Sequence, residues 1–305
     1  MKFLLLVLAL VSCQPKNKEQ ETKPVEKTKL ELLNEKAAVY KKLQANALDE
    51  HGWPVGCDGL GFLALCKTAG GCEKANFFDG EQEAGKWQRN KEHNCQETGR
   101  SKTSISKDML MMSWVYALFG MEKATATAYF ERLESYGKKH DWVMGYPSET
   151  LDDLGRVYMT PSMTWTLYSI LESFGKVIPD EKSLATAPND YHAHLRLLDI
   201  MIQGKLKGGI DVIQMADLTE LHDRDPKNAL YQAAFHRFKD GEMAEVADIL
   251  LDEKLFPKDA LPTSDNYCTH YLWQRDQGAD WLPCDEKNTH DGIDWLFAYW
   301  LAGFK

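Results

Sequence analysis

SKDMLMMSWVYALFGMEKATATAYFERLESYGKKH, residues 106–140, is the stretch that decides which fold we expect. In residues 106–120 apolar side chains occupy nearly every side of a helix, whereas in residues 121–140 they follow a helical spacing with charged residues opposite. A helix that is apolar all round is buried all round, and an amphipathic helix covers a core with one face. The stretch therefore predicts a buried helix followed directly by an outer helix.

Helices of the same two kinds recur through the rest of the chain. Apolar helices are predicted by DGLGFLALC (58–66), PSMTWTLYSILESFG (161–175) and DGIDWLFAYWLAGF (291–304), and a charged one by GEMAEVADILLDEK (241–254). Sustained alternation of apolar and polar residues and hairpin turn signals, which would predict strands, are almost absent. We therefore expect one all-α domain over residues 30–305. Its helices are expected near residues 30–49, 58–69, 106–119, 122–138, 161–174, 190–203, 211–223, 227–239, 242–252 and 289–302.

The alternation of buried and outer helices resembles the (α/α) toroid, or six-hairpin, architecture of many glycoside hydrolases and polysaccharide lyases. The resemblance covers most of residues 30–305 as a pattern and contains no specific motif, so it transfers no catalytic residue. The alternative is an α-solenoid, because DPKNALYQAAFHRFKDGEMAEVADILLDE (225–253) resembles a tetratricopeptide helix pair. A solenoid needs at least about three repeats, and one pair is too few.

The first residues have the pattern of a secretory signal peptide. Lys2 is followed by an uninterrupted apolar run, Phe3–Val11, and then by Ser12 and Cys13. A membrane-spanning helix needs about 20 apolar residues, roughly twice what this run offers. We therefore expect residues 1–12 to be a cleaved signal peptide.

The tetrad Leu10-Val11-Ser12-Cys13 resembles the lipobox of bacterial lipoproteins. The resemblance implies cleavage before Cys13, acylation of this cysteine and anchorage in a lipid bilayer. Gln14 stands where an inner-membrane retention signal places an aspartate, so the resemblance favours the outer membrane, with the mature chain outside the cytoplasm. An ordinary signal peptide with an incidental cysteine is the alternative.

The segment after the cysteine has the composition of a linker. Residues 14–29, QPKNKEQETKPVEKTK, carry Val25 as their only aliphatic side chain among mixed charges and two prolines. Such a segment cannot bury enough apolar surface to fold. We expect residues 13–29 to form a lipidated, flexible tether that lets the domain stand away from the bilayer.

The overall composition excludes some classes of partner. With 44% hydrophobic and 11% aromatic residues the chain can form a substantial core, and its net charge is −10. Nucleic acids and anionic headgroups require basic patches, so we expect neither as a partner. The chain also lacks a nucleophile elbow, a phosphate-binding loop, a zinc-protease helix and a dinucleotide fingerprint, and we expect no cofactor.

Seven cysteines, less the lipidated Cys13, leave six that can pair with one another. An even number in an exported protein favours disulfides, although the sequence leaves the connectivity open. A zinc site that includes His93, His270 or His290 is the alternative, but no CxxC spacing is present and oxidised thiols do not ligate zinc. We therefore expect no metal site, and disulfides that pair locally, Cys268–Cys284 first. The candidates are Cys57, Cys66, Cys72, Cys95, Cys268 and Cys284.

Short polar residues stand at the starts of several predicted inner helices, among them Asp58, Asp108 and Thr160. Such residues commonly cap a helix or interact favourably with its dipole. If the inner helices run parallel, however, their starts meet at one rim, where Asp58 and Asp108 would form a pair of carboxyl groups. Glycoside hydrolysis usually uses two carboxyl groups about 5–9.5 Å apart, so these two are the expected catalytic residues.

Binding residues are expected near the same rim. The residues between and just beyond the last two cysteines concentrate aromatic and charged side chains, which a disulfide would hold in place. Salt bridges that merely pin this loop are the plainer explanation. Aromatic rings can also stack on sugars, although burial in a core is more common. The binding candidates are Arg100, Trp273, Arg275, His290 and Asp291, and the tryptophans in loops or at helix ends include Trp53, Trp87 and Trp142.

Two functions of different class follow from these expectations. The first is an envelope-anchored lipoprotein that acts on a glycan as a hydrolase or lyase, with acidic residues at the toroid rim. The second is a non-catalytic surface lipoprotein that binds a glycan or a partner protein.

Overall fold

The computed structural model describes residues 27–55, 58–91, 105–145, 157–178, 193–239, 241–253, 255–256 and 292–304. In these residues the chain forms ten α-helices, one short 3-10 helix and four short strands. Each of the ten helices expected from the sequence is present, so the all-α expectation is confirmed. The expected signal peptide, Cys13 and most of the tether lie outside the described residues.

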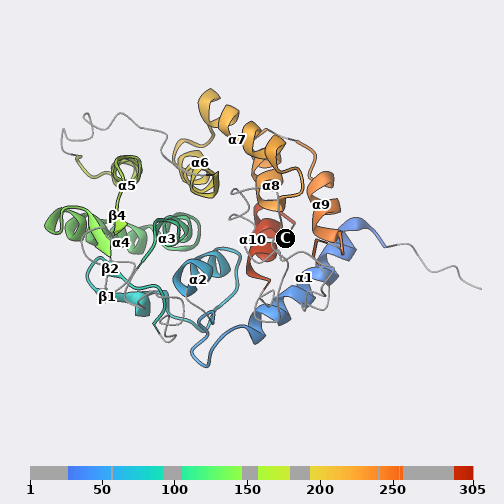
Figure 1. Cartoon of the computed structure of the whole chain (residues 1–305), viewed down its shortest axis with the longest axis horizontal. Coiled ribbons are helices and arrows are strands. Elements are labelled where there is room, and N and C mark those ends of the chain that lie inside the picture. Colours follow the sequence, from blue (N-terminus) through green and yellow to red (C-terminus); the bar gives the residue numbers. More distant parts are fainter. Residues whose placement is uncertain are drawn as a thin grey trace, which may run out of the picture.

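The elements follow one another along the chain as shown in Figure 1. The helices are α1 (Lys29–Asn46), α2 (Gly59–Thr68), α3 (Lys107–Gly120), α4 (Lys123–Lys139), α5 (Pro161–Ser173), α6 (Ala193–Lys207), α7 (Val212–Arg224), α8 (Ala229–Phe238), α9 (Ala244–Leu251) and α10 (Ile293–Leu301). The 3-10 helix η1 spans Phe77–Gly80, and the strands are β1 (Glu81–Glu83), β2 (Lys86–Trp87), β3 (Val143–Gly145) and β4 (Val157–Tyr158).

The strands form two small antiparallel pairs. Glu81 of β1 lies opposite Trp87 of β2, and Val143 of β3 lies opposite Tyr158 of β4. Strands of two or three residues are too short to produce the alternation by which a strand is recognised. The sequence therefore did not predict them.

Polar side chains define where several helices begin. At the start of α1, the Thr28 hydroxyl accepts a hydrogen bond from the backbone N–H of Glu31, and the Glu31 carboxylate accepts one from the backbone N–H of Thr28. This reciprocal pair is a capping box. Asp211 and Gln214 form the same arrangement at the start of α7. The side-chain oxygen of Asn228 caps α8 by accepting from the backbone N–H groups of Leu230 and Tyr231. These bonds satisfy backbone N–H groups that have no partner within the helix.

The apolar helices are the buried ones. Every residue of α2 except Lys67 is buried, and the described side chains of α10 are buried except the partly exposed Tyr299. The apolar runs at 58–66 and 291–304 therefore behave as predicted. Helix α5 differs, because Trp165 and other residues along one of its sides are partly exposed. It packs between α4 and α6 rather than in the centre.

Five helices pack against one another in a closed order. Helix α2 contacts α3, α3 contacts α6, α6 contacts α8, α8 contacts α10, and α10 contacts α2 (Figure 1). The other helices lie outside these five: α1 packs on α10 and α9, α4 on α3 and α5, α7 on α6 and α8, and α9 on α8. No helix in the described ranges is both long enough and apolar enough to cross a membrane.

At least four of these five helices run in the same direction, because their C-terminal ends meet. The rings of Phe119 and Trp300, near the ends of α3 and α10, have centroids 5.5 Å apart. The Lys205 ammonium, near the end of α6, lies 5.1 Å from the centre of the Phe119 ring. Arg237, near the end of α8, donates to the backbone oxygen of Leu301 at 2.9 Å. Cationic side chains at helix C-termini also interact favourably with the helix dipole.

The starts of α2 and α3 lie side by side at Gly61. A Cβ atom on Gly61 would come within 2.7 Å of Met112 Sδ and 3.5 Å of Met109 Cα. A larger residue at this position would require the Met112 side chain to move, so the glycine permits the close contact of the two helices.

One disulfide lies among the described residues. Cys66 in α2 is bonded to Cys72 in the turn that follows, with Cα atoms 5.8 Å apart. This pair confirms local pairing for two of the four cysteines that lie between residues 57 and 95. The other four candidates, Cys57, Cys95, Cys268 and Cys284, lie outside the described residues.

Candidate functional site

The two carboxyl groups expected to be catalytic lie at the same end of the α2–α3 pair. Asp58 directly precedes α2, and Asp108 lies in the first turn of α3. Both side chains are partly exposed. Because Gly61 and Met109 are in close contact, the two aspartates stand at neighbouring helix starts.

Asp58 does not cap its helix. It makes no capping hydrogen bond, and its carboxylate instead accepts a hydrogen bond from the guanidinium of Arg89, whose side chain is only 4% exposed. The backbone oxygen of Arg89 accepts from the N–H of Leu60 at 2.8 Å, which ties the same segment to the start of α2. A buried charge needs a partner, so Asp58 neutralises a buried arginine.

The remaining candidates are three tryptophans in the described ranges and residues outside them. Trp142 is partly exposed and packs on Tyr168, with ring centroids 6.0 Å apart. Trp53 and Trp87 are fully buried, and Trp87 packs on Phe77 with ring centroids 4.9 Å apart. These two rings belong to the core and are not available to a sugar. The binding candidates Arg100, Trp273, Arg275, His290 and Asp291 all lie outside the described residues.

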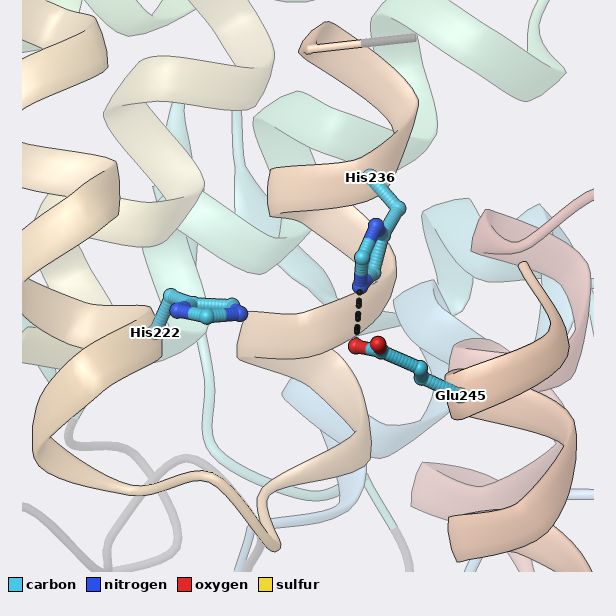
Figure 2. Close-up of side chains that lie close together, drawn as sticks. All are labelled: His222, His236 and Glu245. Carbon is cyan, nitrogen blue, oxygen red and sulfur yellow. Dashed lines mark ion pairs between the residues drawn. The ribbon is translucent and has the colours of Figure 1, made fainter. Parts of the chain in front are cut away.

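A second cluster of polar side chains lies on three consecutive helices. His222 belongs to the last turn of α7, His236 to α8 and Glu245 to α9. Each offers one ligand atom, and the three atoms lie within 4.8 Å of one another. Figure 2 shows the three side chains converging from separate helices on one point.

No protein-family model, curated protein sequence or solved structure matches this chain. The interpretation of both sites therefore depends on the geometry of the residues themselves.

His236 is the buried member of the second cluster. Its side chain is 8% exposed, and its Nε2 lies 3.2 Å from Glu245 Oε2. Within the described part of the chain, neither ring nitrogen makes a hydrogen bond of acceptable geometry. The ring fits only because residue 241 is glycine, since a Cβ atom there would lie 2.2 Å from His236 Nδ1.

His222 is held in one orientation by its neighbours. Its Nδ1 lies 2.7 Å from the carboxylate of Asp223, and its ring stacks on Phe235 with centroids 3.9 Å apart. The other ring nitrogen, Nε2, points toward the His236–Glu245 pair in Figure 2. A carboxylate on Nδ1 favours the tautomer in which Nε2 carries a lone pair, which is the form that binds a metal.

The sequence did not predict this cluster, because no local pattern joins its members. The residues are separated by 14 positions (222 to 236) and 9 positions (236 to 245), which match no compact metal motif. The available signal was indirect. The resemblance of residues 225–253 to a tetratricopeptide helix pair implied that α8 and α9 lie side by side. His236 in α8 and Glu245 in α9 would then be close to each other.

Proposed function

We propose that the chain is an envelope-anchored lipoprotein that binds a glycan, without cleaving it, at the rim of an (α/α) toroid. The anchor rests on the lipobox-like tetrad ending at Cys13. The toroid is supported over an α-solenoid by the closed order of helix contacts, since α10 returns to pack on α2. In a solenoid each repeat contacts only its neighbours along the chain.

The common direction of the central helices supports a functional rim. Because α3, α6, α8 and α10 end together, they also begin at the opposite side of the domain, where Asp108 lies. Helix starts present backbone N–H groups, and beside them Asp108 offers a carboxylate that can accept from sugar hydroxyl groups.

Binding without cleavage is favoured by one observation, the ion pair of Asp58 with buried Arg89. A two-carboxylate mechanism needs both groups to exchange protons or attack the sugar. Asp58 instead pairs with a guanidinium that has little access to water, and removing a carboxylate from a buried ion pair is strongly destabilising. Asp108 then remains as the carboxylate able to meet a ligand.

Glycan cleavage is the second candidate, because the starts of α2 and α3 are in contact and bring two carboxyl groups to one place. In this case Asp58 and Asp108 would be the two carboxyl groups that the mechanism requires.

Co-sedimentation of the purified full chain with insoluble peptidoglycan and other envelope polysaccharides tests the proposal. We expect retention on at least one of them, several-fold weaker retention of Asp108→Asn, and no new reducing ends. Glu220→Gln, an exposed carboxylate on α7, is the matched control and should bind like the unaltered chain. Failure of the unaltered chain to bind, or equal binding by Asp108→Asn, would overturn the proposal. Reducing ends that disappear in Asp108→Asn would establish the second candidate instead.

A further inference from the structure

We propose that His222, His236 and Glu245 bind a zinc ion. This site is independent of the proposed glycan rim, because its residues come from the last turn of α7, from α8 and from α9. Neither its location nor its test depends on the glycan proposal.

The identity of the ligand atoms selects the class of metal. Two imidazole nitrogens and one carboxylate oxygen are a common set of protein ligands for zinc. Magnesium and calcium prefer oxygen ligands throughout and are poorly served by two histidines. Thiolates are absent from this set, so the site does not depend on whether the cysteines are oxidised.

The distances permit coordination after a small adjustment. Around a tetrahedral zinc ion with bonds of about 2.0–2.2 Å, ligand atoms lie about 3.3–3.6 Å apart. The three atoms here are within 4.8 Å of one another, and His236 and Glu245 already approach to 3.2 Å. Glu245, whose side chain is 69% exposed, can move without disturbing the core.

The surroundings favour a bound metal over an empty ion pair. His236 is buried, and its nitrogens lack hydrogen bonds among the described residues, which is costly for a polar group shielded from water. A metal on Nε2 would satisfy that nitrogen. An ion pair of His236 with Glu245 alone would give no role to His222, whose Nε2 faces the pair and whose Nδ1 is engaged by Asp223 (Figure 2).

The fourth coordination position would face solvent. The His222 side chain is 23% exposed and Glu245 is mostly exposed, so water can reach the ion. Zinc sites with three protein ligands and one open position bind a water molecule or an external ligand, whereas structural sites are closed by four protein ligands. We therefore expect an accessible zinc ion with one water-derived ligand.

Calorimetric titration of zinc into the metal-free full chain, purified with its disulfides intact, tests the site. We expect one zinc ion per chain, no comparable binding of magnesium, and affinities at least about tenfold weaker for His222→Ala and Glu245→Gln. Asp223→Asn should weaken binding by roughly 10–100-fold, the usual effect of removing a partner of a ligating histidine. Circular dichroism would verify that each variant is folded.

Glu242→Gln and His51→Ala are the matched controls, because both change exposed residues of the same types outside the cluster. They should bind zinc like the unaltered chain. The absence of stoichiometric zinc binding would overturn the proposal, as would a Glu245→Gln variant that binds as tightly as Glu242→Gln.

Discussion

Replacing Asp199 by asparagine should stabilise the protein at neutral and alkaline pH. Asp199 lies in α6 and accepts a hydrogen bond from the hydroxyl of Thr166 in α5 at 2.8 Å. Burial raises the pKa of Asp199 to about 6, from an ordinary value of 3.8, and the bond from Thr166 opposes this rise only in part. The native protein therefore binds a proton at this carboxyl group more tightly than the unfolded chain does.

The sign of the pH dependence follows from this difference. Between about pH 4 and pH 6 the Asp199 carboxyl group is protonated to a greater extent in the native state than in the unfolded state. The contribution of this group to the free energy of unfolding therefore falls as pH rises. Above about pH 6 the Asp199 carboxylate of the native protein is charged, and the full free-energy cost of burying that charge applies. A shift from 3.8 to about 6 corresponds to roughly 3 kcal/mol at 1.36 kcal/mol per unit, and this is a ceiling because Asp199 is partly exposed.

Asp199→Asn keeps an acceptor for Thr166 and removes the charge. Its free energy of unfolding should exceed that of the unaltered chain by up to about 3 kcal/mol at pH 8, and the difference should shrink toward zero near pH 4. Urea unfolding followed by circular dichroism at pH 4, 6 and 8 measures the difference in the free energy of unfolding and its dependence on pH. Asp248→Asn, an exposed carboxylate on α9, should show no comparable change. A variant that is less stable at pH 8, or whose advantage does not change with pH, would refute the reasoning.

Two further predictions concern the covalent features of the chain. Metabolic labelling with a clickable fatty acid should modify the protein, and Cys13→Ala should abolish the label; persistent labelling would contradict the lipid anchor. Replacing Cys66 and Cys72 together by alanine should lower the free energy of unfolding by about 2 kcal/mol, the value expected for a disulfide that closes so short a loop. Urea titration without reductant measures this difference. An unchanged free energy of unfolding would contradict the prediction.

The helices could be predicted from the sequence because their signals are local. Residues 106–120 and 121–140 differ in how their apolar residues are spaced, and this difference predicted a buried α3 followed by an outer α4. The spacing of apolar residues did not predict that one side of α5 is partly exposed. Residues 161–175 form an apolar run of the kind that predicts a buried helix, and only the packing between α4 and α6 leaves Trp165 partly exposed.

The sites were harder to predict because they depend on contacts between distant residues. Asp58 was expected to be a catalytic carboxylate, with helix capping as the plainer alternative, but it accepts a hydrogen bond from Arg89, which lies 31 positions further along the chain. Trp53 and Trp87 stand outside the helices, where aromatic rings suggested sugar binding, yet both are core residues. His222, His236 and Glu245 have no common motif, and only the packing of three successive helices brings them together.

Anomalous diffraction at the zinc absorption edge, from crystals of the full chain grown with zinc, would locate the ion directly. We predict a peak about 2.0–2.2 Å from His222 Nε2, His236 Nε2 and a carboxylate oxygen of Glu245. Zinc peaks elsewhere on the molecule, with none between these three side chains, would contradict the site.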